Sequence, residues 1–148
     1  MINPTTLCQS VIEISISIGD WMMFEQKKFN SSSIEMKSFN NLVSYVDKKS
    51  EECFIEELKK LIPECGIIGE EGLEKHTTKE YTWIIDPLDG TTNFAHSVPI
   101  FCTSVALLYE KRIILYLLDK SENIMSLEIS GKLITLLPVE TGQGKNGP

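Results

Sequence analysis

The chain has 148 residues, of which 42% are hydrophobic and 24% charged, as expected of one globular domain. Its net charge of −7 argues against a nucleic-acid partner and against binding to an anionic membrane surface. The longest apolar run, residues 113–118, is too short to cross a bilayer, and residues 1–10 do not resemble a secretory signal. The four cysteines lack metal-binding spacing, which predicts reduced thiols and a cytoplasmic protein.

The first predicted element is a helix over residues 4–28. Pro4 follows an asparagine, as at a capped helix start, and Leu7, Val11 and Ile18 recur at helical spacing. The isoleucines of this stretch also alternate with polar residues, which would fit a strand equally well. The cap signal and the length of the segment favour the helix.

A second helix is predicted over residues 48–62, with Asp47 as its N-cap and Pro63 ending it. Its apolar residues form one stripe, and its charged residues form i,i+4 pairs typical of a solvated face. Before this helix, the alternation of residues 34–37 is typical of a short strand at a sheet edge.

The strands are expected later in the chain. The segment CGIIGEE, residues 65–71, reads as a short buried strand that ends at two glutamates. Another apolar run ends at Asp86, and three further apolar segments, 101–109, 113–118 and 124–129, have the spacing of an antiparallel meander.

The stretch WIIDPLDGTTNF, residues 83–94, indicates a strand that carries two carboxylates to a turn. Two ionised carboxylates about 4 Å apart repel by roughly 4 kcal/mol at an effective dielectric constant near 20, and a divalent cation would cancel this repulsion. Gly90 allows close approach to a phosphate, which the following amides could bind. A lone pair of this kind is more often an ordinary turn. The haloacid-dehalogenase pattern is excluded, because Asp86 and Asp89 are three residues apart instead of two.

Residues 86–94, DPLDGTTNF, resemble the D-P-[LI]-D-G-T-[TS]-N-F signature of the inositol monophosphatase family of magnesium-dependent, lithium-sensitive phosphatases. The GEE segment at residues 69–71 is similar to a second family motif. This resemblance covers about residues 7–129 and implies an α/β fold in which two N-terminal helices pack on a mainly antiparallel sheet. We expect a metal- and phosphate-binding half over residues 1–130 and an irregular tail over 131–148.

The resemblance also implies a site. Magnesium, two or three ions in the family with manganese as a possible substitute, would be held by oxygens of Glu70, Asp86, Leu88 and Asp89. The catalytic groups that orient the attacking water would be Glu70 and Thr91. The phosphate and the substrate would be bound by Leu88, Asp89, Gly90 and Thr91.

The function expected from this resemblance is hydrolysis of a small phosphate monoester, with inositol-1-phosphate as the default substrate. Alternatives are a fructose-bisphosphatase-like or nucleotide 3′-phosphatase-like specificity, or a non-catalytic chain that keeps metal or phosphate binding. The family's second half contains a W-D-x-A-A-G motif whose aspartate completes the metal site, and no such motif occurs here. The chain therefore looks like an N-terminal half, and its uncovered apolar surface predicts a homodimer.

Overall fold

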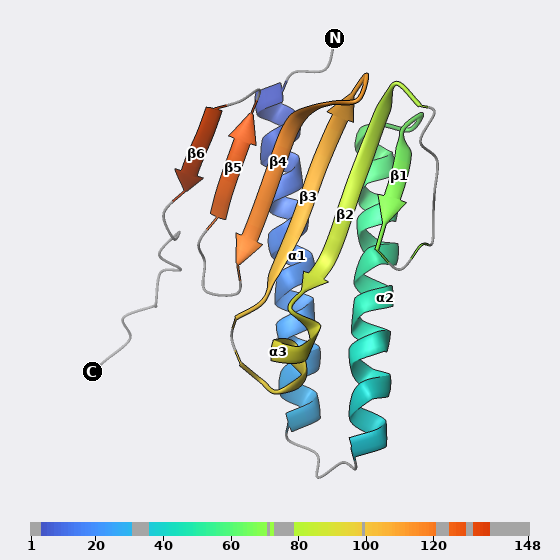
Figure 1. Ribbon diagram of the computed structural model, residues 1–148, viewed down its shortest axis with the longest axis vertical. Coiled ribbons are helices and arrows are strands. Elements are labelled where there is room, and N and C mark those ends of the chain that lie inside the picture. Colours follow the sequence, from blue (N-terminus) through green and yellow to red (C-terminus); the bar gives the residue numbers. More distant parts are fainter. Residues whose placement is uncertain are drawn as a thin grey trace, which may run out of the picture.

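Two long helices lie on one face of a six-stranded sheet, and a short helix lies at one end of it (Figure 1). The computed structural model describes residues 4–30, 36–70, 72, 79–98, 100–120, 125–129 and 132–136. The helices are α1 (Pro4–Asn30), α2 (Met36–Leu61) and α3 (Thr91–Ala95). The strands are β1 (Gly66–Gly69), β2 (Tyr81–Asp89), β3 (Cys102–Tyr109), β4 (Arg112–Lys120), β5 (Met125–Ile129) and β6 (Lys132–Leu136).

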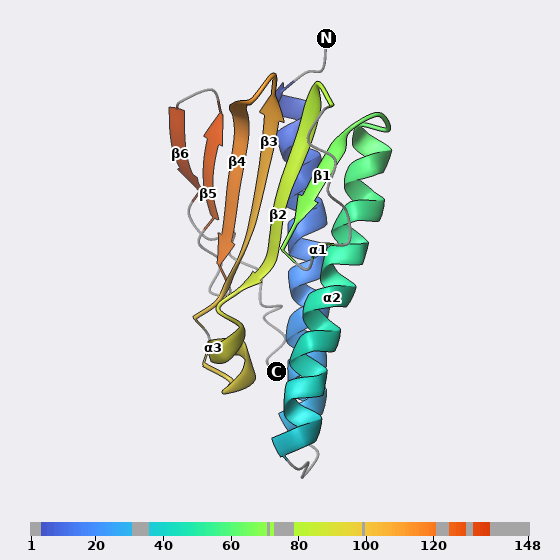
Figure 2. The ribbon, with the colours of Figure 1, turned by 45° about the vertical axis from the view of Figure 1, so that its right-hand side comes forward.

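The strands lie in the sheet in the order of the chain, from β1 to β6. Strands β1 and β2 are parallel, and every later neighbouring pair is antiparallel. The prediction of two helices on a mainly antiparallel sheet is therefore confirmed. Turning the molecule shows α1 and α2 packed side by side against the same face of the sheet (Figure 2).

The first helix forms as predicted, because its apolar residues recur at a spacing that places them on one side of α1. Leu7, Val11, Ile18 and Met22 are buried there against the sheet and α2. The alternating isoleucines do not form a strand. Ile16, for example, is 42% exposed on the outer side of the helix.

The second helix is longer than predicted. It begins at Met36, so the strand expected over residues 34–37 is wrong for Met36 and Lys37, and the rest of that segment lies outside the described residues. Asp47 is not an N-cap but a buried residue within α2. The prediction failed because an alternating segment of four residues is too short to distinguish a strand from a helix. The helix can extend back to Met36 because no proline or glycine interrupts the chain between Met36 and Leu61. The predicted end at Pro63 is confirmed.

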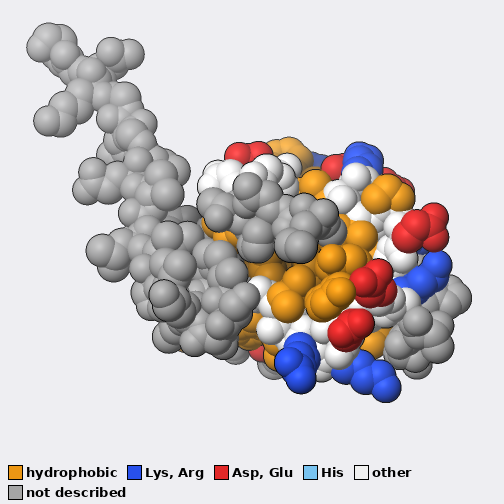
Figure 3. All heavy atoms as spheres, turned by 90° about the horizontal axis from the view of Figure 1, so that it is seen from above, with side chains coloured by type: hydrophobic (Ala, Val, Ile, Leu, Met, Phe, Trp, Pro, Cys, Tyr) orange, Lys and Arg blue, Asp and Glu red, His pale blue; other side chains and the backbone are white. Residues whose placement is uncertain are grey.

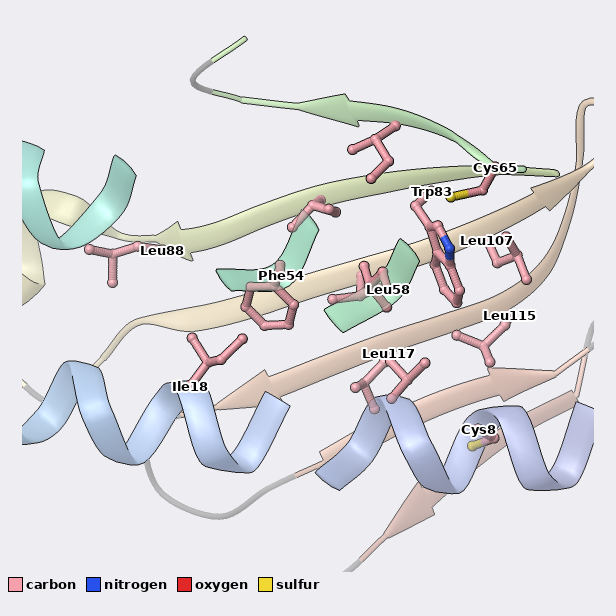
Figure 4. Packing of buried hydrophobic residues seen from close by; sticks show 14 of the residues in the cluster. Cys8, Ile18, Phe54, Leu58, Cys65, Trp83, Leu88, Leu107, Leu115 and Leu117 are labelled. Atoms are coloured by element: carbon pink, nitrogen blue, oxygen red, sulfur yellow. The ribbon is translucent and has the colours of Figure 1, made fainter. Parts of the chain in front are cut away.

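The hydrophobic core lies between the helices and the sheet (Figure 4). Alternate side chains of the central strands face the helices, because successive residues of a strand point to opposite faces. Trp83 of β2 is fully buried, and Phe54 and Leu58 of α2 pack into the same cluster. The other core residues of the central strands are Ile85, Val105, Leu107, Leu115 and Leu117.

The other face of the sheet carries no helix within the part of the chain that the structure describes (Figure 1). Ile84 pairs with Ala106, which in turn pairs with Tyr116, so these three side chains form a row across that face. Ile84 is 39% exposed. We call this side of β2, β3 and β4 the open face.

The sheet continues beyond the predicted boundary at residue 130. Strand β6 pairs with β5, so residues 132–136 of the expected irregular tail form a strand, and residues 137–148 lie outside the described part. The four cysteines form no disulfide, in agreement with the prediction of reduced thiols. Among the described helices, none combines the length and the apolar character needed to span a membrane.

Candidate functional site at the ends of β1 and β2

The parallel pairing of β1 and β2 brings two acidic residues together. Gly69 is aligned with Ile85, so the next residue of each strand, Glu70 and Asp86, meets at the same end of the sheet. The two carboxyl groups are close enough to interact, since Glu70 raises the pKa of Asp86 both by hydrogen bonding and by its charge. The predicted convergence of Glu70 and Asp86 is thus found in the structure.

A bulge in β2 places Asp89 beside this pair. Asp86 is aligned with Ser104 of β3 and Asp89 with Cys102, so three steps along β2 match two steps along β3. Residues three apart in a regular strand point to opposite faces, and one extra residue returns them to the same face. Asp86 and Asp89 therefore both lie on the open face. An Asp89 oxygen accepts a weak hydrogen bond from the Cys102 thiol, with Sγ 3.7 Å from Oδ2.

The turn between the two aspartates is fixed by two hydrogen bonds. The hydroxyl of Thr103, a buried residue of β3, donates to the Pro87 carbonyl at 2.8 Å. The Leu88 amide donates to Asp86 Oδ1 at 3.2 Å, and the Leu88 side chain is buried. The sequence pattern did not identify Thr103, and the one available signal was a threonine at an inward position of a mainly apolar strand.

We expect Thr103→Val to weaken both the turn and metal binding. Valine keeps the shape of threonine but leaves the buried Pro87 carbonyl without this donor, which costs about 1–2 kcal/mol of unfolding free energy. Urea unfolding measures the loss, and magnesium titration should show weaker binding. Thr103→Ser keeps the hydroxyl and is the control. Equal stability of the valine variant and the native protein would contradict the prediction.

The chain leaves the site through Gly90, which has a φ of +99° and precedes α3. An added Cβ at this position would lie 3.1 Å from the Ile100 carbonyl oxygen and 3.2 Å from Phe101 Cα. Helix α3 is held in place from α1, because the buried Gln26 amide donates to the Phe94 carbonyl at 2.8 Å. The predicted turn into a helix is therefore confirmed.

The acidic groups of the site interact unfavourably when they are ionised. Burial, followed by the hydrogen bond and charge of Glu70 and then the charge of Asp89, raises the pKa of Asp86 to about 7, while the Leu88 amide opposes this effect. The ordinary value for this carboxyl is 3.8. Among the described residues, no basic side chain contributes to this shift, so the site concentrates negative charge.

The chemistry of these donors suits a hard divalent cation, because carboxylate and carbonyl oxygens are the ligands that magnesium prefers. The fit is incomplete: within the described residues, no group of three histidine, cysteine or acidic side chains is arranged to hold a metal ion. Glu70 and Asp86 are in contact, while Asp89 acts on Asp86 by charge from the same face. Further ligands would have to come from backbone carbonyls such as that of Leu88 and from water.

The site lies at the end of the sheet next to α3 (Figure 1). The opposite end, seen in Figure 3, shows hydrophobic side chains gathered at the centre with acidic and basic side chains around them. The structure therefore brings the predicted residues Glu70, Asp86 and Asp89 to one end of the molecule. Gly90 and Thr91 follow Asp89 directly in the sequence. Their individual roles remain predictions.

Comparison with known proteins agrees with these features. The sequence model of the inositol monophosphatase family matches residues 8–119. An inositol monophosphatase of Dictyostelium discoideum is 40% identical over 111 residues, which are 72% of this chain and 40% of the relative. A fructose-1,6-bisphosphatase/inositol-1-monophosphatase of Aquifex aeolicus is 44% identical over 81 residues, which are 55% of this chain and 31% of the relative.

The fold is shared with solved structures. Inositol monophosphatase II from Staphylococcus aureus superposes with a TM-score of 0.76 at 20% sequence identity, covering 95% of this chain and 52% of that structure. The present chain therefore spans about half of that structure, and 40% or less of the two relatives above.

Proposed function

The chain belongs to the inositol monophosphatase family, and we propose that it acts in the magnesium-dependent hydrolysis of a small phosphate monoester, with inositol-1-phosphate as the first candidate substrate. The observation that supports this proposal most is the meeting of Glu70 and Asp86 at the ends of two parallel strands, with Asp89 on the same face. A carboxyl group whose pKa is raised by neighbouring carboxylates, as that of Asp86 is, gains most from a cation that neutralises it.

The metal would be held by the carboxylates of Glu70, Asp86 and Asp89 together with the Leu88 carbonyl. When bound, magnesium supplies charge neutralisation for the phosphoryl oxygens and lowers the pKa of a coordinated water. The half-buried position of Asp86 and the bulge that turns Asp89 to the same face support this assignment. Asp89 would in addition accept a hydrogen bond from a substrate hydroxyl.

The phosphate would lie against Leu88, Gly90 and Thr91, with the amides of Gly90 and Thr91 donating to its oxygens. Gly90 supports this role because it has no side chain and a backbone conformation that other residues rarely adopt. The Thr91 hydroxyl and the Glu70 carboxylate would orient the attacking water, and Glu70 would accept its proton. Thr91 directly follows Gly90 and begins α3, so its position depends on that turn.

A phosphate-release assay tests this function. The chain should release phosphate from inositol-1-phosphate only when magnesium is present, and Glu70→Gln should abolish the release. The exposed Glu64, six positions earlier, provides the matched control Glu64→Gln, which should be active. Absence of magnesium-dependent turnover above the Glu70→Gln background would refute catalysis by this chain.

Two observations favour alternatives that the same assay separates. The Aquifex aeolicus relative carries the name of a bisphosphatase as well as a monophosphatase, so fructose-1,6-bisphosphate is the second substrate to test. The chain spans 40% or less of the two relatives above, so the other alternative to test is metal or phosphate binding without catalysis. Magnesium binding by calorimetry without turnover of any tested substrate would select that alternative.

We expect the open face to associate with the same face of a second copy. Ile84, Ala106 and Tyr116 form an apolar row there, and Ile84 is 39% exposed. Sedimentation at micromolar concentration should show a dimer, and Ile84→Lys should give a monomer. Phe24 of α1 is 57% exposed on another surface, so Phe24→Lys is the control and should remain dimeric. A native monomer at these concentrations would contradict the prediction.

A further inference from the structure

Helix α2 buries a carboxyl group that the proposed chemistry does not use. Among the described side chains of this helix, the apolar Val46, Phe54 and Leu58 are buried, and so are three polar side chains: Asp47, Ser50 and Glu51. Glu51 has no exposed surface. Burying a carboxylate costs several kcal/mol unless its oxygens are bound, so such a group is expected to serve a specific purpose.

The Glu51 carboxyl group lies directly against Gly69, the last residue of β1. A Cβ atom added to Gly69 would be 2.8 Å from Glu51 Oε2 and would overlap Oε1 and Cδ. Gly69 does not have a positive φ, so its backbone would accept other residues. A side chain at position 69 would therefore displace the carboxyl group of Glu51, which fills the space that glycine leaves.

This contact is one residue away from Glu70. Strand β1 ends at Gly69, so the direction of the Glu70 side chain depends on how the last peptide of the strand is held. On one side that peptide is aligned with β2 through the pairing of Gly69 with Ile85. On the other side, toward α2, it meets Glu51.

We propose that Glu51 is a positioning residue, whose buried carboxylate braces the end of β1 and so holds Glu70 beside Asp86. This inference rests on the proposed metal site for its effect on magnesium, but the brace itself does not require a bound metal. Glu51 would act through its contact with the end of β1 and not through its charge on Asp86, since the charges that raise the pKa of Asp86 are those of Glu70 and Asp89.

Magnesium titration of two neighbouring variants tests the proposal. Glu51→Gln keeps the shape of the side chain but replaces an acceptor oxygen with an NH2 donor, and we expect magnesium to bind about 10- to 100-fold more weakly, as for residues that orient metal ligands. Glu52→Gln changes the next residue of the same helix, whose side chain is 40% exposed and forms an ion pair with Lys49, and this variant should bind magnesium as the native chain does. Native affinity in a folded Glu51→Gln variant would overturn the proposal.

A second pair of variants separates positioning from stability. Gly69→Ala should destabilise the chain by overlap with Glu51, and the double variant Glu51→Ala/Gly69→Ala should recover stability because the overlap is removed. Magnesium affinity should remain low in the double variant, since the brace is absent. Recovery of affinity together with stability would show that Glu51 merely fills space, and would overturn the proposal.

Hydrogen exchange of the metal-free protein gives a readout that does not depend on the proposed function. Amides of residues 66–70 should exchange faster in Glu51→Ala than in the native chain, while those of β3 and β4 should be unchanged. Unchanged exchange at residues 66–70 would overturn the brace. If the native chain binds no magnesium but the exchange changes as expected, the proposed function fails and the brace stands.

Discussion

Replacing Asp86 by asparagine should stabilise the metal-free protein at pH 8 and at the same time remove its response to magnesium. The folded protein raises the pKa of Asp86 from 3.8 to about 7, so the folded state keeps a proton that the unfolded chain releases. Stability of the native protein therefore falls as the pH rises from about 4 to 7, and the loss is complete above 7. Asparagine resembles the protonated acid and avoids this loss.

The size of the effect is limited because Asp86 is only half-buried. The full pKa difference corresponds to about 4 kcal/mol, and solvent screening reduces this to roughly 1–2 kcal/mol.

Thermal unfolding without metal should show the Asp86→Asn variant more stable than the native protein at pH 8, with the difference narrowing toward pH 5. Magnesium at millimolar concentration should raise the melting temperature of the native protein alone. Asp20→Asn, an exposed change on α1, should behave as the native chain. A variant that is less stable without metal at pH 8, or equally stabilised by magnesium, would contradict this expectation.

The part of the site that lies within one motif could be predicted from the sequence. Pro87 and Gly90 determine a turn by their own backbone preferences, so the end of β2 and the start of α3 follow from local chemistry. The meeting of Glu70 with Asp86 also followed, because each comes at the end of an apolar strand. The spacing of Asp86 and Asp89 alone would place them on opposite faces, and only the pairing with β3 reveals the bulge that reverses this.

Contacts between distant segments could not be predicted in this way. The hydrogen bonds of Gln26 with the Phe94 carbonyl and of Thr103 with the Pro87 carbonyl join residues that no local pattern relates. The buried position of Glu51 is hidden for a different reason. It stands in a polar, mostly charged stretch that resembles a solvated helix face, and only its contact with the end of β1 reveals its position.

Gly90→Ala should cause a large loss of both stability and phosphate binding. Gly90 has a φ of +99°, which costs a residue with a side chain about 1–3 kcal/mol. The new Cβ would also press on the Ile100 carbonyl oxygen at 3.1 Å and on Phe101 Cα at 3.2 Å, and these are backbone atoms that cannot rotate away. Relief of this contact requires the turn to move, which displaces the Gly90 and Thr91 amides proposed to bind phosphate.

Gly19 in the middle of α1 offers a control with the opposite sign, since alanine is favoured over glycine inside a helix by about 1 kcal/mol. Urea unfolding should therefore show Gly19→Ala at or above native stability and Gly90→Ala well below it. Titration with inorganic phosphate in the presence of magnesium, under conditions where both variants are folded, should show binding to Gly19→Ala only. Because the two substitutions are chemically identical, a shared loss of binding would reflect a general effect of the alanine methyl group. Undiminished phosphate binding by folded Gly90→Ala would remove the Gly90 turn from the proposed site.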